Sequence, residues 1–134
     1  MKKYDYIILG TGPAAYQLIK LLATQHKSIL VVESGLFGGT CPNVGCEPKI
    51  YLDGAVQAIL SSRQFEKEGI ISQIGKLNWS QLMKEKKERF ASWPNETRKN
   101  ISKISDVISG SAHFVDRQTI EVNRQYFQGN RIII

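Results

Sequence analysis

The two cysteines of this chain, Cys41 and Cys46, lie five positions apart in the segment GGTCPNVGCEP at residues 38–48. In a regular helix, residues with this separation are displaced by roughly 7.5 Å along the axis. A disulfide needs Cα atoms within about 4.4 to 6.8 Å of each other. A bridge between the two cysteines therefore requires a distorted turn, which the surrounding glycines and prolines permit. A disulfide that closes so short a loop is readily reduced, so the pair favours redox chemistry over a structural staple.

Metal binding and unreactive core thiols are the alternatives for these cysteines. A C-x4-C spacing can form half of a zinc site, but the other half needs two further ligands. The two histidines, His26 and His113, lie far apart and neither belongs to a ligand pair. We therefore expect no metal site.

A second pattern that can do chemistry, Gly10-x-Gly12-x-x-Ala15, follows an apolar run at residues 4–9 and opens a helical pattern. In a nucleotide-binding turn the first glycine makes the tight turn and the second leaves room for a pyrophosphate. A small third residue lets helix and strand pack closely. Glu33 ends the next apolar run and can accept hydrogen bonds from the ribose of an adenosine. These residues predict a dinucleotide site; the alternative is an ordinary glycine turn beside a solvated glutamate.

The elements that must position these residues follow from the hydrophobic periodicity. Strands at residues 4–9 and 28–32, joined by a helix that ends near residue 26, form one βαβ unit. Three further helices are expected, at residues 50–61, at 79–91, and from Asn95, as the cap, to about 103. Four short strands are expected, at residues 106–109, 112–115, 119–122 and 131–134, with Gly129-Asn130 as one of the intervening turns. This order predicts an α/β fold.

The composition fits one globular domain, since 42% of the 134 residues are hydrophobic. No apolar run approaches the ~20 residues that span a bilayer, so we expect a cytoplasmic protein with no membrane partner. The net charge is +6, but the run KEKKER at residues 84–89 mixes both signs, as on a solvated helix face. No aromatic residues alternate with the basic ones, so we expect no nucleic-acid partner.

The run G-G-T-C-P-N-V-G-C-E-P-K, preceded by the nucleotide turn and Glu33, resembles the redox-active signature of class I pyridine nucleotide-disulfide oxidoreductases. This family includes glutathione reductase, dihydrolipoamide dehydrogenase and mercuric reductase. The likeness covers essentially the whole chain, because residues 110–116 and 119–122 resemble the family's β-meander. It implies an α/β, Rossmann-like FAD-binding domain, with a parallel sheet, helices and a small β-meander, that is incomplete relative to the family.

The resemblance also implies roles for individual residues. Cys41 and Cys46 would form the redox disulfide, with Cys46 beside the flavin ring and Cys41 attacking the substrate, for which a lowered thiol pKa is expected. Residues expected to contact FAD come from the turn, the acid, the cysteine segment, one cation and the meander: Gly10, Gly12, Pro13, Ala14, Ala15, Glu33, Gly39, Thr40, Cys41, Lys49 and Ala112. Glu47 departs from the family, which usually has an apolar residue there, and its carboxylate is expected to raise the neighbouring thiol pKa. Ile50 replaces a lysine that many members carry.

The implied activity is that of a flavoprotein disulfide reductase in cell redox homeostasis. Electrons would pass from NADPH or NADH through FAD to the cysteine pair and on to a small disulfide or dithiol substrate, as in glutathione reductase. Residues 1–134 would be the N-terminal part of the FAD-binding domain, with the nicotinamide-binding and dimerisation domains absent. We expect this portion alone to be inactive and able to self-associate, whereas full-length members are homodimers. The alternative is a non-enzymatic nucleotide-binding module whose cysteine loop senses redox state.

Overall fold

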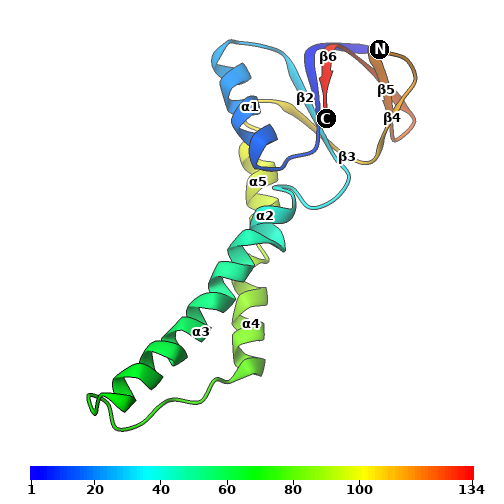
Figure 1. The fold of residues 1–134 in the computed structure, drawn as a ribbon. Helices are drawn as coiled ribbons and strands as arrows, with labels where there is room; N and C mark the ends of the chain where they lie inside the picture. Colours follow the sequence, from blue (N-terminus) through cyan, green and yellow to red (C-terminus); the bar gives the residue numbers. More distant parts are fainter.

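Six strands and five helices make up the computed structural model, which describes residues 1–134. They are β1 (Lys2–Leu9), α1 (Pro13–Thr24), β2 (Ile29–Glu33), α2 (Thr40–Asn43), α3 (Cys46–Lys67), α4 (Trp79–Phe90), α5 (Trp93–Ile101), β3 (Asp106–Ser109), β4 (Ala112–Phe114), β5 (Thr119–Val122) and β6 (Gln125–Ile133). Figure 1 shows α1 and α5 beside one sheet, while α3 and α4 extend away from it. The expected Rossmann-like α/β fold is confirmed.

The six strands form a single mixed sheet in the order β3-β2-β1-β6-β5-β4. Strand β1 is parallel to β2 and β6, and β2 is parallel to β3. Strands β4, β5 and β6 are antiparallel neighbours and make up the meander. Because parallel strands end at the same edge of a sheet, the segments that follow β1, β2 and β3 meet there.

Two apolar clusters hold the layers together. On one face, strand residues pack against α1 and the end of α5, and the buried members are Ile8, Ile19, Leu22, Ile29, Val31, Phe37 and Ile101. On the other face, the same strands pack against β5 and β6 of the meander, through Tyr4, Ile7, Leu30, Val32, Ile120, Val122 and Phe127. Strand β2 is therefore apolar almost throughout because both of its faces are covered.

The last strand differs from the sequence prediction. Strand β6 begins at Gln125 rather than at residue 131, and Gly129 lies inside it. The turn is formed instead by Asn123 and Arg124, whose φ angles of 51° and 63° are typical of a two-residue hairpin. Gly129 is required for packing, since a Cβ there would lie 2.8 Å from Cγ1 of Ile7.

The helices after β2 also differ in their bounds. Helix α3 begins at Cys46 and has 22 residues, whereas the sequence predicted residues 50–61. Helix α5 begins at Trp93 after Ser92, so Asn95 lies in its first turn and the prediction that it caps the helix is wrong. Pro94 is tolerated there because the N–H groups in the first turn of a helix have no carbonyl partner within the helix, so the missing N–H of proline costs no hydrogen bond. Helix α4 matches its prediction, and the side chain of Asn78 caps it by accepting from Gln81 N at 3.0 Å.

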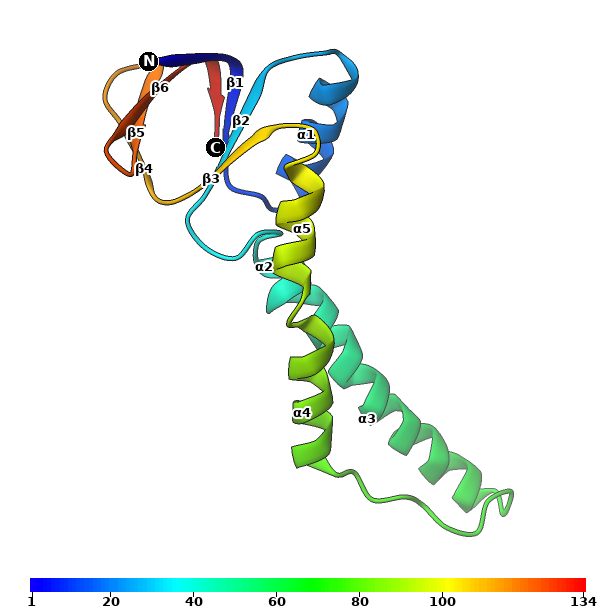
Figure 2. The same ribbon diagram turned by 180° about the vertical axis from the view of Figure 1, so that it is seen from behind.

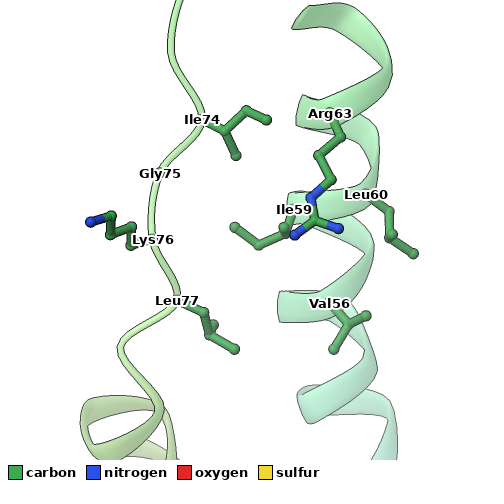
Figure 3. Close-up of a pocket in the computed structure, with 8 residues that line it drawn as sticks. All are labelled: Val56, Ile59, Leu60, Arg63, Ile74, Gly75, Lys76 and Leu77. Carbon is green, nitrogen blue, oxygen red and sulfur yellow. The ribbon is translucent and has the colours of Figure 1, made fainter. Parts of the chain in front are cut away.

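Helices α3 and α4 lie side by side as an arm that projects from the sheet, as Figures 1 and 2 both show. At its base the Phe90 ring contacts Tyr51 and Trp93 edge-on, with centroids 6.1 and 4.7 Å apart. Near its tip, a cavity of about 530 Å³ separates α3 from the loop that precedes α4. Ile74 and Leu77 point from the loop towards the helix (Figure 3). None of the helices is both long enough and apolar enough to span a membrane.

Candidate functional site

The glycine turn lies between the end of β1 and the start of α1. Gly10 has a φ of +99°, and its N–H donates to the carbonyl of Val32 at 2.7 Å, which joins the turn to β2. A Cβ built on Gly10 or on Gly12 would meet no atom within 4 Å, so both residues face open space. The first helical hydrogen bond runs from Tyr16 N to Gly12 O. The N–H groups of the residues just before Tyr16 are therefore free to bind an anion.

Thr11 joins the turn to the acidic residue at the end of β2. This side chain is only 1% exposed, and its hydroxyl donates to Oε2 of Glu33 at 2.5 Å. The other carboxylate oxygen of Glu33 accepts from Gly35 N at 2.8 Å. The Glu33 carboxylate is thus held at the carboxyl edge of the sheet, although each oxygen keeps a further lone pair for a ligand.

Thr11 also joins the turn to the cysteine segment. Its Oγ1 accepts a hydrogen bond from Gly38 N at 2.8 Å. The next residue, Gly39, has a φ of +70°, and a Cβ there would lie 3.0 Å from Cα of Gly12. The cysteine segment therefore packs directly on the backbone of the nucleotide turn, which a side chain at position 39 would prevent.

The cysteine segment makes the distorted turn that the sequence predicted. Helix α2 ends at Asn43, Val44 and Gly45 interrupt the helical path, and Cys46 is the first residue of α3. A Cβ on Gly45 would lie 3.0 Å from the carbonyl oxygen of Thr40, so a side chain at position 45 would crowd the junction of the two helices. The Asn43 side chain stabilises the turn, because its amide donates hydrogen bonds to the carbonyls of Phe37 and Gly39 at 2.9 and 2.8 Å.

Both cysteines are free thiols in this structure. The interaction of Cys41 with the side chain of Cys46, followed by burial and by the charge of Cys46, raises the pKa of the Cys41 thiol. The backbone N–H of Cys46 opposes this rise, and Glu47 adds weakly to it. The expectation of a lowered pKa is thus wrong for Cys41, whereas Glu47 acts in the expected direction on that thiol.

A pocket of about 370 Å³ opens beside Cys41. Its walls come from the nucleotide turn and α1, the cysteine segment, and α5. Tyr16, Glu47, Trp93 and Thr97 line it together with Cys41, whereas Cys46 does not. Cys41 is therefore the thiol that a ligand in this pocket would meet.

The remaining residues that the sequence predicted for the site lie in several different elements around it. Ala112 begins β4, two residues after Gly110, whose N–H donates to the carbonyl of Glu33 at 2.9 Å. Thr40 is exposed at the start of α2. Lys49 lies in the first turn of α3, and its ammonium has no carboxylate partner. Pro13, Ala14 and Ala15 form the first turn of α1 beside Gly12.

Sequence reasoning missed Thr11, Tyr16, Trp93 and Thr97. Thr11 occupies a variable position of the glycine pattern, so only its burial and its two hydrogen bonds reveal it. The other three look like ordinary helix residues in the sequence, and nothing in the order of the chain places α5 beside the cysteines.

The residues of the site fit a dinucleotide such as FAD. Two glycines leave open space where a Cβ would otherwise stand, and helix α1 begins with unpaired N–H groups. Glu33 offers a fixed carboxylate next to that turn. A pyrophosphate and a ribose need these three features from a protein.

Comparisons with known proteins point in the same direction. The family described as "Pyridine nucleotide-disulphide oxidoreductase" matches residues 4–134. A dihydrolipoyl dehydrogenase of Mycoplasma genitalium is 36% identical over 134 residues, which cover 98% of this chain and 29% of that protein. A mercuric reductase of Bacillus cereus is 31% identical over 137 residues, which cover 98% of this chain and 21% of that protein. This chain therefore spans less than a third of the length of either relative.

A solved structure has the same fold. The Cu(II) complex of the HOCl-induced flavoprotein disulfide reductase RclA from Escherichia coli superimposes with a TM-score of 0.77 at 26% identity. The match covers 98% of this chain and 28% of that chain.

Proposed function

This chain belongs to the pyridine nucleotide-disulphide oxidoreductase family, and from that membership we propose that residues 1–134 are the FAD-binding part of a flavoprotein disulfide reductase. The family is FAD-dependent and takes its electrons from a nicotinamide nucleotide. The observation that carries the proposal is the bonding of Thr11, which joins the nucleotide turn, Glu33 and the cysteine segment into one unit.

We assign the cofactor contacts to the residues that lie at this edge of the sheet. Gly10 and Gly12 would accommodate the pyrophosphate, and the N–H groups of Ala14 and Ala15 would bind its oxygens. Glu33 would accept hydrogen bonds from the ribose, and Ala112 would lie near the adenine. Bound FAD would supply the two-electron relay between the nicotinamide nucleotide and the cysteine pair.

The cysteine pair would then reduce a disulfide in two exchange steps. Cys41 attacks one sulfur of the substrate; a mixed disulfide forms, the substrate S–S bond breaks, and the leaving thiolate takes up a proton. Cys46 attacks the Cys41 sulfur and releases the second substrate thiol, so that two electrons have left the dithiol.

Several finer assignments belong to the same proposal. The substrate is a small disulfide or dithiol, and the donor is NADPH or NADH. A reactive dithiol of this kind needs a reducing compartment, which favours the cytoplasm. Turnover would require nicotinamide-binding and dimerisation domains outside residues 1–134, in a homodimer, and these residues alone would be inactive.

The test is to bind FAD to the chain and then expose the reduced protein to a small disulfide. We expect flavin fluorescence to change saturably, and Glu33→Ala to weaken FAD binding roughly tenfold or more through loss of charge-assisted hydrogen bonds. We also expect the intact mass to fall by about two hydrogens, the stoichiometry of one exchange-formed disulfide, and Cys41→Ser to abolish that loss. No saturable FAD binding, or a dithiol inert to disulfides, would refute the proposal.

One other function is compatible with two free thiols beside the nucleotide turn, a nucleotide-binding module whose cysteine loop only senses redox state. Electron transfer distinguishes the two. An enzyme passes electrons from bound flavin to the disulfide, whereas a sensor does not.

A further inference from the structure

The pocket beside Cys41 contains one charged side chain among the residues that line it, the carboxylate of Glu47. We propose that this pocket selects a disulfide substrate that carries ammonium groups and disfavours one that carries carboxylates. The inference rests on the proposed function, since it names the substrate class for the same cysteine pair.

The carboxylate of Glu47 lies where its charge can attract or repel a substrate that reacts with Cys41. It follows Cys46 in the first turn of α3 and lines the same pocket as Cys41. Its charge already acts on the Cys41 sulfur, because it contributes to the raised pKa of that thiol. A carboxylate on a substrate held against Cys41 would therefore be repelled by Glu47, and an ammonium would be attracted.

No cation lines the pocket to reverse this preference. Two of the helices that form its walls, α1 and α5, each carry a basic residue one or a few positions from a lining residue, but both of these basic residues lie over aromatic rings. Lys20 of α1 lies over the Tyr16 ring at 5.5 Å, and Arg98 of α5 lies over the Phe37 ring at 5.6 Å. Neither is among the lining residues.

The uncharged walls add to the preference for a cation. Trp93 of α5 is a half-buried aromatic residue among those that line the pocket. The face of an aromatic ring attracts an ammonium group and has no comparable attraction for a carboxylate. Gln17 and Thr97 supply neutral polar groups that can bond the remainder of a small ligand.

The experiment measures the first exchange step alone, in the Cys46→Ser variant, where Cys41 is the only thiol. Cystamine serves as the cationic probe, dithiodipropionate as the anionic probe and hydroxyethyl disulfide as the neutral probe. The selectivity is the ratio of the cystamine rate to the dithiodipropionate rate at one pH, so that the thiolate fraction of Cys41 cancels. Mixed-disulfide formation is followed by intact mass.

We expect Glu47→Gln to lower this selectivity by roughly three- to tenfold, the effect of one partly screened charge at a few ångströms on two probes of opposite sign. Glu66→Gln, which removes the same charge from the far end of α3, should leave the ratio unchanged. In the protein that keeps Glu47, added salt should also reduce the ratio towards its Glu47→Gln value. The salt series needs no substitution at position 47 and so does not depend on how that variant folds.

A selectivity that Glu47→Gln leaves unchanged, or an equal change on Glu66→Gln, would overturn the inference while leaving the disulfide-reductase proposal intact. A Cys41 that reacts with none of the three probes would overturn both. This measurement does not involve the flavin. A protein that fails to bind FAD would therefore still give the same selectivity and the same Cys41 reactivity.

Discussion

At the scale of single residues, Thr11 is the side chain on which the site depends most. It is buried between two glycines that face open space, and its hydroxyl both donates to Glu33 and accepts from Gly38. A nucleotide turn needs no hydroxyl at this position for its own conformation. We therefore infer that Thr11 positions the ribose acid relative to the cysteine segment.

Replacing Thr11 with valine keeps the shape of the side chain but removes both hydrogen bonds and leaves the Gly38 N–H without a partner. We expect the free energy of unfolding to fall by about 1–3 kcal/mol and FAD binding to weaken, as measured by denaturant titration and flavin fluorescence. Thr11→Ser retains the hydroxyl and should restore most of both. Thr24→Val, on an exposed residue, is the matched control. A Thr11→Val protein that binds FAD as the parent does would contradict this role.

The pKa of Cys41 predicts a pH dependence. Because the interaction with the Cys46 side chain is the largest cause of the rise in pKa, Cys41 should be alkylated by iodoacetamide with a midpoint above the ordinary thiol range. Cys46→Ser should move the midpoint of Cys41 to lower pH. Since the pKa is raised on folding, the stabilising effect of the protonated thiol is present at neutral pH and is lost as pH rises through that midpoint. A midpoint that is the same in both proteins would show that the two thiols are not coupled.

At the scale of elements, the contact between the cysteine segment and the nucleotide turn depends on Gly39. Its φ is +70°, and a Cβ would meet the backbone of Gly12 at 3.0 Å. We expect Gly39→Ala to lower the free energy of unfolding by about 1–3 kcal/mol through backbone strain and to weaken FAD binding. Gly54 lies in α3 with open space around it, so Gly54→Ala should stabilise the protein slightly. Both effects are measured by thermal or denaturant unfolding. A Gly39→Ala protein as stable as the parent would mean that the two segments are not in close contact.

The same elements show what the sequence could predict. The βαβ unit could be predicted because its hydrophobic periodicity is typical of strand, helix and strand in that order. The distorted turn could be predicted because glycines and prolines surround Cys41. The start of α3 could not be predicted, because apolar periodicity begins at Ile50 while the helix begins at Cys46. The hairpin turn at Asn123-Arg124 was missed because a nearby glycine, Gly129, is a stronger turn signal and is used for packing against Ile7 instead. The side chains that line the Cys41 pocket come from three distant segments, so only the tertiary structure reveals them.

At the scale of the whole molecule, the arm formed by α3, α4 and their connecting loop is the least covered part. Several large apolar side chains on it are at least two-fifths exposed: Val56, Leu60, Phe65, Ile70, Leu77 and Trp79. Apolar surface of this kind is characteristic of interaction sites. We propose that this apolar surface drives self-association. Strand β6, at the end of the chain, is paired with both β1 and β5 and so has no free edge for pairing with a second chain.

Sedimentation velocity over a range of concentrations tests this proposal. We expect the sedimentation coefficient to rise with protein concentration, and the double change Val56→Lys and Leu60→Lys to abolish the rise by placing charges on the exposed face of α3. Leu21→Lys adds charge at a comparably exposed position of α1 and should have no such effect. A concentration-independent coefficient for the unchanged protein would contradict the proposal.

We propose that the nucleotide turn and the cysteine pair form one redox unit within residues 1–134. The most direct measurement is anaerobic two-electron reduction of the FAD-loaded chain with its cysteines oxidised, followed by a count of free thiols and by flavin absorbance. We expect two thiols to appear while the flavin band is largely retained, because electrons pass on to the disulfide. A bleached flavin with no new thiols would contradict this proposal.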